Sequence, residues 1–236
     1  YVDQSVRVVH RLRQMKPQAM LLAGSRLGPP AANEALDVEL GRYVRSGGRV
    51  VVVGDDELNH DSVVLPRRLG AYDLVVALAE RGYRNASLID YDSDSTAGRA
   101  WLEGIADAAR QTGMRIDHSP EPVLSGSREA GQAAMAALIQ TSNDIDVVIA
   151  STDMLAIGAM RAMRQAGIEP GSGLAVAGFG NALNSSDVLP SLTTVDLSLA
   201  KAGVAAVDLA VGAAGPQPVR LAVDARVLIR DSTPER

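Results

Sequence analysis

The sequence contains no cysteine and very few aromatic residues. The absence of cysteine excludes disulfide bonds, thiolate metal sites and a cysteine nucleophile, and it suits a reducing compartment. Phe, Trp and Tyr make up only 3% of the 236 residues, so a core must consist mainly of Ala, Val, Leu, Ile and Met. A chain of this length buries roughly 70% of its unfolded surface, which is enough for a sizeable core.

Positive charge is also scarce. The formal net charge is −5, Lys16 and Lys201 are the only lysines, and the arginines are scattered. Because binding to nucleic acid needs a basic face that neutralises phosphates, we do not expect these residues to bind DNA themselves. No segment approaches the roughly 18 consecutive apolar residues of a membrane span, so we expect no membrane partner.

Short apolar runs alternate with longer segments of helical periodicity. The runs cover residues 19–23, 50–53, 87–89, 147–150 and 174–177, and helical patterns cover residues 2–15, 36–44, 70–81, 96–112, 127–140, 154–166 and 198–211. Such alternation, with strands that are apolar along their whole length, is typical of parallel sheets covered on both faces. The sequence therefore predicts an α/β fold.

No motif for catalysis or for a cofactor stands out. The sequence has no P-loop, no G-x-S-x-G elbow and no H-E-x-x-H helix. Asp90, Asp92 and Asp94 alternate like the start of a calcium loop, but Ser95 stands where glycine is needed and Trp101 where the bidentate Glu is needed. We therefore expect no enzyme activity, no cofactor and no metal.

Three motifs indicate a family. They are Thr152-Asp153, Leu192 to Val195 (LTTV) and, some thirty residues later, Arg230 to Thr233 (RDST). With them the sequence resembles the effector-sensing core of the LacI family of bacterial transcription regulators. The resemblance implies two Rossmann-like lobes with parallel sheets joined by three crossovers, as in type I periplasmic binding proteins, with a small-molecule effector between the lobes. It also implies a cytoplasmic homodimer. The apolar helix at 154–163 is compatible with a dimer interface, although core packing explains it equally well.

The resemblance also implies domain boundaries. We expect crossovers near residues 66–67, 196–197 and 222–223, which gives an N-terminal lobe of 1–66 plus 197–222 and a C-terminal lobe of 67–196 plus 223–236. Tyr1 aligns near the second helix of the effector domain, so we expect an incomplete N-terminal lobe and a DNA-binding helix-turn-helix that precedes these residues. The alternative is an exported solute-binding protein of an uptake transporter, which a signal peptide upstream would indicate.

Open α/β sheets bind ligands at the carboxyl ends of their strands. We therefore expect ligand contacts in the loops that follow the apolar runs, and the resemblance adds positions on the following helix and at the first crossover. The candidate ligand-binding residues are Asp55, Arg67, Tyr91, Ser95, Arg99, Trp101, Thr152, Phe179 and Asn181. Asp153 is expected to cap the helix that it begins.

Three positions depart from the pattern of similar proteins. These often carry an effector-gripping arginine three residues before a helix glycine; here Trp101 holds that place relative to Gly104, with Arg99 two residues earlier. Thr152 replaces a common asparagine, and Gly180 replaces an acidic residue that accepts sugar hydroxyls in sugar-sensing relatives. The departures disfavour a polyol effector bound in the usual sugar mode. If Trp101 lines the cleft, they favour stacking on a ring.

Each candidate also has a purely structural interpretation. Trp101 is equally well explained as a core residue, Asn181 as a turn residue and Asp55 as a strand-end carboxylate. Arg99 and Arg67 are better explained as solvated side chains. Ser95 or its neighbour is expected to cap the following helix, whether or not it also faces the cleft.

Overall fold

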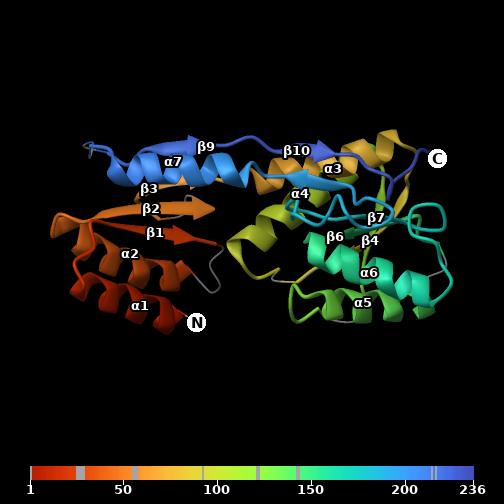
Figure 1. Cartoon of the computed structure of the whole chain (residues 1–236), viewed down its shortest axis with the longest axis horizontal. Coiled ribbons are helices and arrows are strands. Elements are labelled where there is room, and N and C mark those ends of the chain that lie inside the picture. Colours follow the sequence, from red (N-terminus) through yellow and green to blue (C-terminus); the bar gives the residue numbers. More distant parts are fainter. Residues whose placement is uncertain are drawn as a thin grey trace. The chain divides into compact units, whose positions relative to one another are not determined.

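The computed structural model describes residues 2–24, 30–54, 58–91, 93–120, 123–141, 144–213, 215 and 217–236 (Figure 1). The helices are α1 (Val2–Gln14), α2 (Pro30–Arg45), α3 (Arg67–Glu80), α4 (Thr96–Thr112), α5 (Arg128–Thr141), α6 (Asp153–Gln165) and α7 (Leu199–Val211). The strands are β1 (Ala19–Ala23), β2 (Arg49–Gly54), β3 (Asp61–Val64), β4 (Asn85–Ile89), β5 (Arg115–His118), β6 (Val147–Ala150), β7 (Ala175–Ala177), β8 (Thr194–Asp196), β9 (Arg220–Ala222) and β10 (Arg226–Leu228).

The chain forms two compact units. Unit 1 comprises Tyr1–Pro66, Asp94–Ala97 and Ser198–Asp224, and unit 2 comprises Arg67–Ser93, Gly98–Leu197 and Ala225–Arg236. Each unit is built around its own sheet of four parallel strands. The predicted α/β class with parallel sheets is therefore confirmed.

In unit 1 the strand order is β1-β2-β3-β9. Successive side chains of a strand point to opposite faces of a sheet, and β2 is apolar on both of its faces. Val50 and Val52 pack with side chains of α1 and α2, whereas Val51 packs with Ala202 and Ala206 of α7. Helices α1 and α2 thus cover one face of this sheet, and α7 covers the other (Figure 1).

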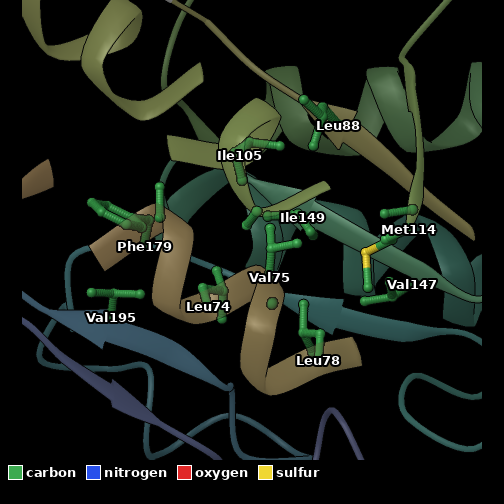
Figure 2. Packing of buried hydrophobic residues seen from close by; sticks show 14 of the residues in the cluster. Leu74, Val75, Leu78, Leu88, Ile105, Met114, Val147, Ile149, Phe179 and Val195 are labelled. Carbon is green, nitrogen blue, oxygen red and sulfur yellow. The ribbon is translucent and has the colours of Figure 1, made fainter. Parts of the chain in front are cut away.

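In unit 2 the strand order is β5-β4-β6-β7. Along β6, Val147 and Ile149 belong to the cluster formed with α3 and α4, whereas Val148 and Ala150 belong to the cluster formed with α5 and α6. Figure 2 shows part of the first cluster, in which side chains from helices and strands interdigitate. An antiparallel pair, β8 with β10, packs against α3 of the same unit.

Within the residues that the structure describes, no helix is both long enough and apolar enough to cross a membrane.

Candidate functional site

The loops that follow β4, β6 and β7 meet at one edge of the unit 2 sheet, because these strands are parallel and end on the same side. The backbone amide of Tyr91, after β4, donates to Ser151 Oγ, after β6, at 3.3 Å. The amide of Asp153 donates to the carbonyl oxygen of Phe179, after β7, at 3.2 Å. This carboxyl edge therefore brings together segments that supplied many of the candidates from the sequence.

Thr152, and not Asp153, caps helix α6. Thr152 has extended backbone angles, and its Oγ1 accepts the backbone N–H of Leu155 at 3.2 Å. The expected capping role of Asp153 is therefore wrong: this residue is the first of the helix, and its carboxylate accepts the amide of Ala182 and the hydroxyl of Thr194, both at 2.5 Å. Asp153 thus ties the start of α6 to the loop after β7 and to β8.

The Asp153 carboxyl is only 1% exposed. Burial raises its pKa above the ordinary value, because the charged form loses its hydration. The hydrogen bonds from Thr194 and Ala182 and the nearby charge of Arg230 act in the opposite direction and offset part of that effect. Both carboxylate oxygens accept hydrogen bonds from the protein, so Asp153 is a buried residue that holds the loops of this edge together and does not face the solvent.

Asn181 is held by Arg230. Its Oδ1 accepts from Arg230 Nη2 at 2.9 Å and from Ser185 Oγ at 3.4 Å, and its backbone amide donates to Thr194 Oγ1 at 3.2 Å. The preceding residue, Gly180, has φ +121°, a conformation that residues with a side chain rarely adopt. The backbone itself therefore favours glycine at the position where sugar-sensing relatives carry an acid.

The LTTV and RDST motifs hold each other. The amide of Thr193 donates to Ser232 Oγ at 2.8 Å, and Ser232 Oγ donates to the carbonyl oxygen of Val176 at 2.6 Å. The hydroxyls of Thr193 and Thr233 lie 2.7 Å apart. The two motifs thus connect β7, the segment before β8 and the end of the chain, next to the loop after β7 that forms part of the carboxyl edge.

The sequence model of the periplasmic binding protein-like domain family matches residues 75–233, which include all three loops of the carboxyl edge. The chain belongs to this family.

Curated relatives of this periplasmic binding protein-like domain are bacterial transcription regulators. The HTH-type transcriptional regulator CelR of Thermobifida fusca is 27% identical over 150 residues, which cover 64% of this chain and 44% of that protein. The HTH-type transcriptional repressor CytR of Escherichia coli is 28% identical over 180 residues, which cover 75% of this chain and 50% of that protein. The chain spans about half the length of the curated relatives it matches. The predicted resemblance to the core of LacI-type regulators is confirmed.

Solved structures show the same fold. A LacI family transcriptional regulator from Enterococcus faecium with bound ribose matches with a TM-score of 0.84 at 19% identity, covering 98% of this chain and 85% of that chain. A complex of the transcriptional regulator CelR with cellobiose matches with a TM-score of 0.77 at 23% identity, covering 97% and 69%. The predicted periplasmic binding protein-like fold is therefore confirmed.

Two aromatic candidates lie in the core of the periplasmic binding protein-like domain. Trp101 is 2% exposed and Phe179 is 4% exposed, and both belong to the cluster between the sheet and helices α3 and α4. Figure 2 shows Phe179 among Leu74, Val195 and their neighbours. The indole N–H of Trp101 has no hydrogen-bond partner among the described residues. The core interpretation describes the position of Trp101. Ligand stacking on Trp101 and ligand contact by Phe179 stay predictions.

The other candidates differ in exposure. Tyr91 is half-buried at the carboxyl edge, and Ser95 is buried immediately before α4. Arg99 is exposed on α4, and Arg67 is half-buried as the first residue of α3. Asp55 lies outside the described residues. Ligand contact by any of them stays a prediction.

The apolar face of α6 is used within unit 2. Leu155, Ala159, Met160 and Met163 are buried in the cluster that α5, α6 and the sheet form together. Core packing therefore explains the apolar pattern at 154–163. The homodimer stays a prediction.

A pocket of about 300 Å³ in unit 1 was not predicted. Arg49, His60, Asp61 and Gln217 are among its lining residues, at the amino ends of β2 and β3 and before β9. Arg49 is paired with Asp61 at 3.0 Å, and burial lowers the pKa of His60, which keeps its ring neutral near pH 7. The described residues of this pocket therefore present compensated or neutral groups, at the opposite strand ends from those predicted to bind ligand.

Proposed function

We propose that the chain is the effector-binding and dimerisation core of a LacI-type transcription regulator. It binds a small molecule at the carboxyl edge of unit 2 and controls DNA binding by a helix-turn-helix outside these residues, as a cytoplasmic homodimer. The observation that carries the proposal is the family match over residues 75–233, together with curated relatives that are HTH-type regulators and align over this core.

The chemistry of the edge supports binding without reaction. Thr152 Oγ1 is engaged in the helix cap, and the Asp153 carboxylate is buried and hydrogen-bonded to Ala182 and Thr194. Neither is arranged as a nucleophile with an adjacent base. An effector regulates by binding one conformation better than another, and a few kcal/mol of differential binding is enough to shift the population.

The network around Asp153 gives a route for such a shift. Asn181 donates its backbone amide to the Thr194 hydroxyl, which in turn donates to Asp153 at the start of α6. Thr194 begins β8, and one residue beyond β8 the chain passes from unit 2 to unit 1, between Leu197 and Ser198. A ligand that moves Asn181 therefore acts on hydrogen bonds at the segment that leads into unit 1.

DNA binding tests the regulator. The gene product that includes the residues upstream of Tyr1 is expected to give a discrete gel-shift complex with DNA from its own promoter. The 236-residue chain alone is expected to give none, because it has net charge −5 and scattered arginines. A discrete complex with the isolated chain would contradict the proposal.

The alternative of an exported solute-binding protein makes a different prediction for the residues upstream of Tyr1. A helix-turn-helix there supports the regulator, and a signal peptide supports transport.

Sedimentation of the purified chain at micromolar concentration tests the dimer, and a monomer throughout would remove that part of the proposal.

A further inference from the structure

After β6 and β7, the side-chain oxygens of Ser151, Thr152 and Asn181 accept hydrogen bonds from the protein, and their N–H and O–H groups remain as donors. Ser151 Oγ accepts the amide of Tyr91 at 3.3 Å, and Thr152 Oγ1 accepts the amide of Leu155 at 3.2 Å. Asn181 Oδ1 accepts from Arg230 at 2.9 Å. Each hydroxyl keeps its proton and one lone pair, whereas the amide NH₂ of Asn181 can only donate.

The orientation of the Asn181 amide follows from its partner. Arginine carries only donors, so the amide oxygen must face Arg230 and the nitrogen must point away from it. The side chain is half-buried, and its nitrogen donates to no residue that the structure describes. It is also not among the buried polar atoms that lack a partner. The Asn181 NH₂ is therefore a solvent-accessible donor in a fixed direction.

The carboxylate beside this loop, Asp153, is buried and is already used as an acceptor within the protein. Both oxygens of Asp153 accept hydrogen bonds from Ala182 and Thr194. Gly180 has no side chain, and a Cβ built on it would meet nothing within 4 Å, so there is room for a ligand beside Asn181. Asp90, at the end of β4, has interactions of its own, and its buried Oδ1 has no hydrogen-bond partner among the described residues. A hydroxyl proton of a ligand placed against the Asn181 NH₂ would find no acceptor on the buried Asp153 or on Gly180.

We propose that the effector group seated against the ends of β6 and β7 is a carboxylate or carbonyl oxygen, and that Asn181 is the residue that sets this preference. The inference rests on the proposed effector-binding function. A carbonyl or carboxylate accepts from several donors and brings no O–H that must be left unpaired. Leaving a polar group unpaired in a binding site costs enough to discriminate strongly against the wrong ligand.

Matched ligands test the preference. The melting temperature of the purified chain is measured with D-glucose, D-glucuronate and D-glucuronamide, with D-galactose and D-galacturonate, with D-ribose and cellobiose, and with uracil and hypoxanthine. Within a sugar series the members differ only at one carbon, which carries either a hydroxyl or an sp² oxygen. Probes with a carboxylate or carbonyl are expected to raise Tm, and their neutral polyol partners are expected to raise it less or not at all.

Variants assign the preference to Asn181. Asn181→Asp keeps an oxygen for Arg230 and replaces the outward donor with an acceptor, so affinity for a stabilising acceptor probe is expected to fall at least tenfold by calorimetry. Asn181→Gly suits φ +51° and removes the donor, which gives a second variant with a similar expected loss. Leu183→Ser, at a side chain that is 98% exposed in the same loop, is the control and is expected to bind as the parent does.

The outcomes separate this inference from the proposed function. Stabilisation by neutral sugars alone would overturn the inference and leave effector sensing intact. The same holds if Asn181→Asp binds an acceptor probe as tightly as the parent. Stabilisation by no probe at all would count against both the inference and the effector-binding function.

Discussion

Helices α6 and α7 each have thirteen residues and are rich in apolar side chains, yet they are buried to different extents. α6 lies between α5 and the sheet of unit 2 and buries most of its residues. α7 packs on β1, β2 and β3 of unit 1 and buries only Ala202 and Ala206. Its outward face leaves Val204 63% and Val211 78% exposed. Apolar composition therefore does not decide burial by itself; a second packing partner does.

Glycines mark the same difference. At Gly158 of α6, an added Cβ would overlap with the carbonyl oxygen of Arg128 on α5, and at Gly131 of α5 it would overlap with the carbonyl oxygen of Leu155 on α6. These two helices approach each other through positions that have no side chain. At Gly203 of α7, an added Cβ would meet nothing within 4 Å. The same substitution should therefore have opposite effects in the two helices.

The largest effect is expected for Gly158→Ala, which should destabilise unit 2 by about 3 kcal/mol, since α5 and α6 have to separate to admit the methyl group. Gly203→Ala should stabilise unit 1 by about 0.5–1 kcal/mol, because alanine is the better helix former and nothing is displaced. Trp101, the only tryptophan, lies in the core of unit 2, so its fluorescence during urea unfolding reports on that unit. Circular dichroism follows both units.

Two results would contradict this difference between α6 and α7. If Gly158→Ala costs less than about 1 kcal/mol, the two helices are not held at the close distance that the structure gives. If Gly203→Ala destabilises, the face of α7 around Val204 is covered in solution, and a second copy of the chain becomes the first partner to test by sedimentation.

Patterns of apolar residues along the sequence predict the strands and helices that pack against the core. The run at 147–150 is β6, and the helix at 96–112 is α4, because their apolar residues face the core. β5 (Arg115–His118) was not predicted, since it is an edge strand with mostly exposed side chains and is defined by its backbone pairing with β4. Local periodicity contains no information on such a strand.

The sequence predicted which loops form the candidate site, but not which hydrogen-bond donors and acceptors they present. Parallel strands place their following loops at one edge, so the segments at Tyr91, Thr152 and Asn181 were expected there. The hydrogen bond from Arg230 that orients the Asn181 amide joins residues far apart in sequence. Likewise, the Asp153 carboxylate accepts hydrogen bonds from Ala182 and Thr194, which are distant in sequence. The sequence alone therefore led to the wrong prediction that Asp153 caps α6.

The next largest effect is expected at the start of α6. Asp153→Ala is expected to cost about 2 kcal/mol, because the Ala182 amide and the Thr194 hydroxyl lose their acceptor. Asp153→Asn removes the titration. Because burial raises the folded-state pKa above the unfolded value of about 3.9, the stability from this group is present below that pH and is lost as pH rises through the folded pKa.

Unfolding free energies of the parent and of Asp153→Asn, measured at several pH values from about 4 to 7, check the sign. The parent should lose stability relative to the variant as pH rises. A parent that gains stability instead would mean that the Arg230 charge and the two hydrogen bonds outweigh burial, so that the folded-state pKa is lowered.

The smallest effect is expected at the cap of α6, where the two helices differ again. Thr152 Oγ1 accepts the Leu155 amide, whereas Ser198 before α7 has φ +51° and makes no side-chain cap hydrogen bond. Thr152→Ala should therefore cost about 1 kcal/mol, and Thr152→Ser, which keeps the hydroxyl, should cost much less. If both variants lose the same amount in urea unfolding, the methyl group and not the cap stabilises this helix start. Because the Thr152 proton is also one of the donors left over at the carboxyl edge, Thr152→Ser should retain affinity for an acceptor-bearing probe, and Thr152→Ala should weaken it.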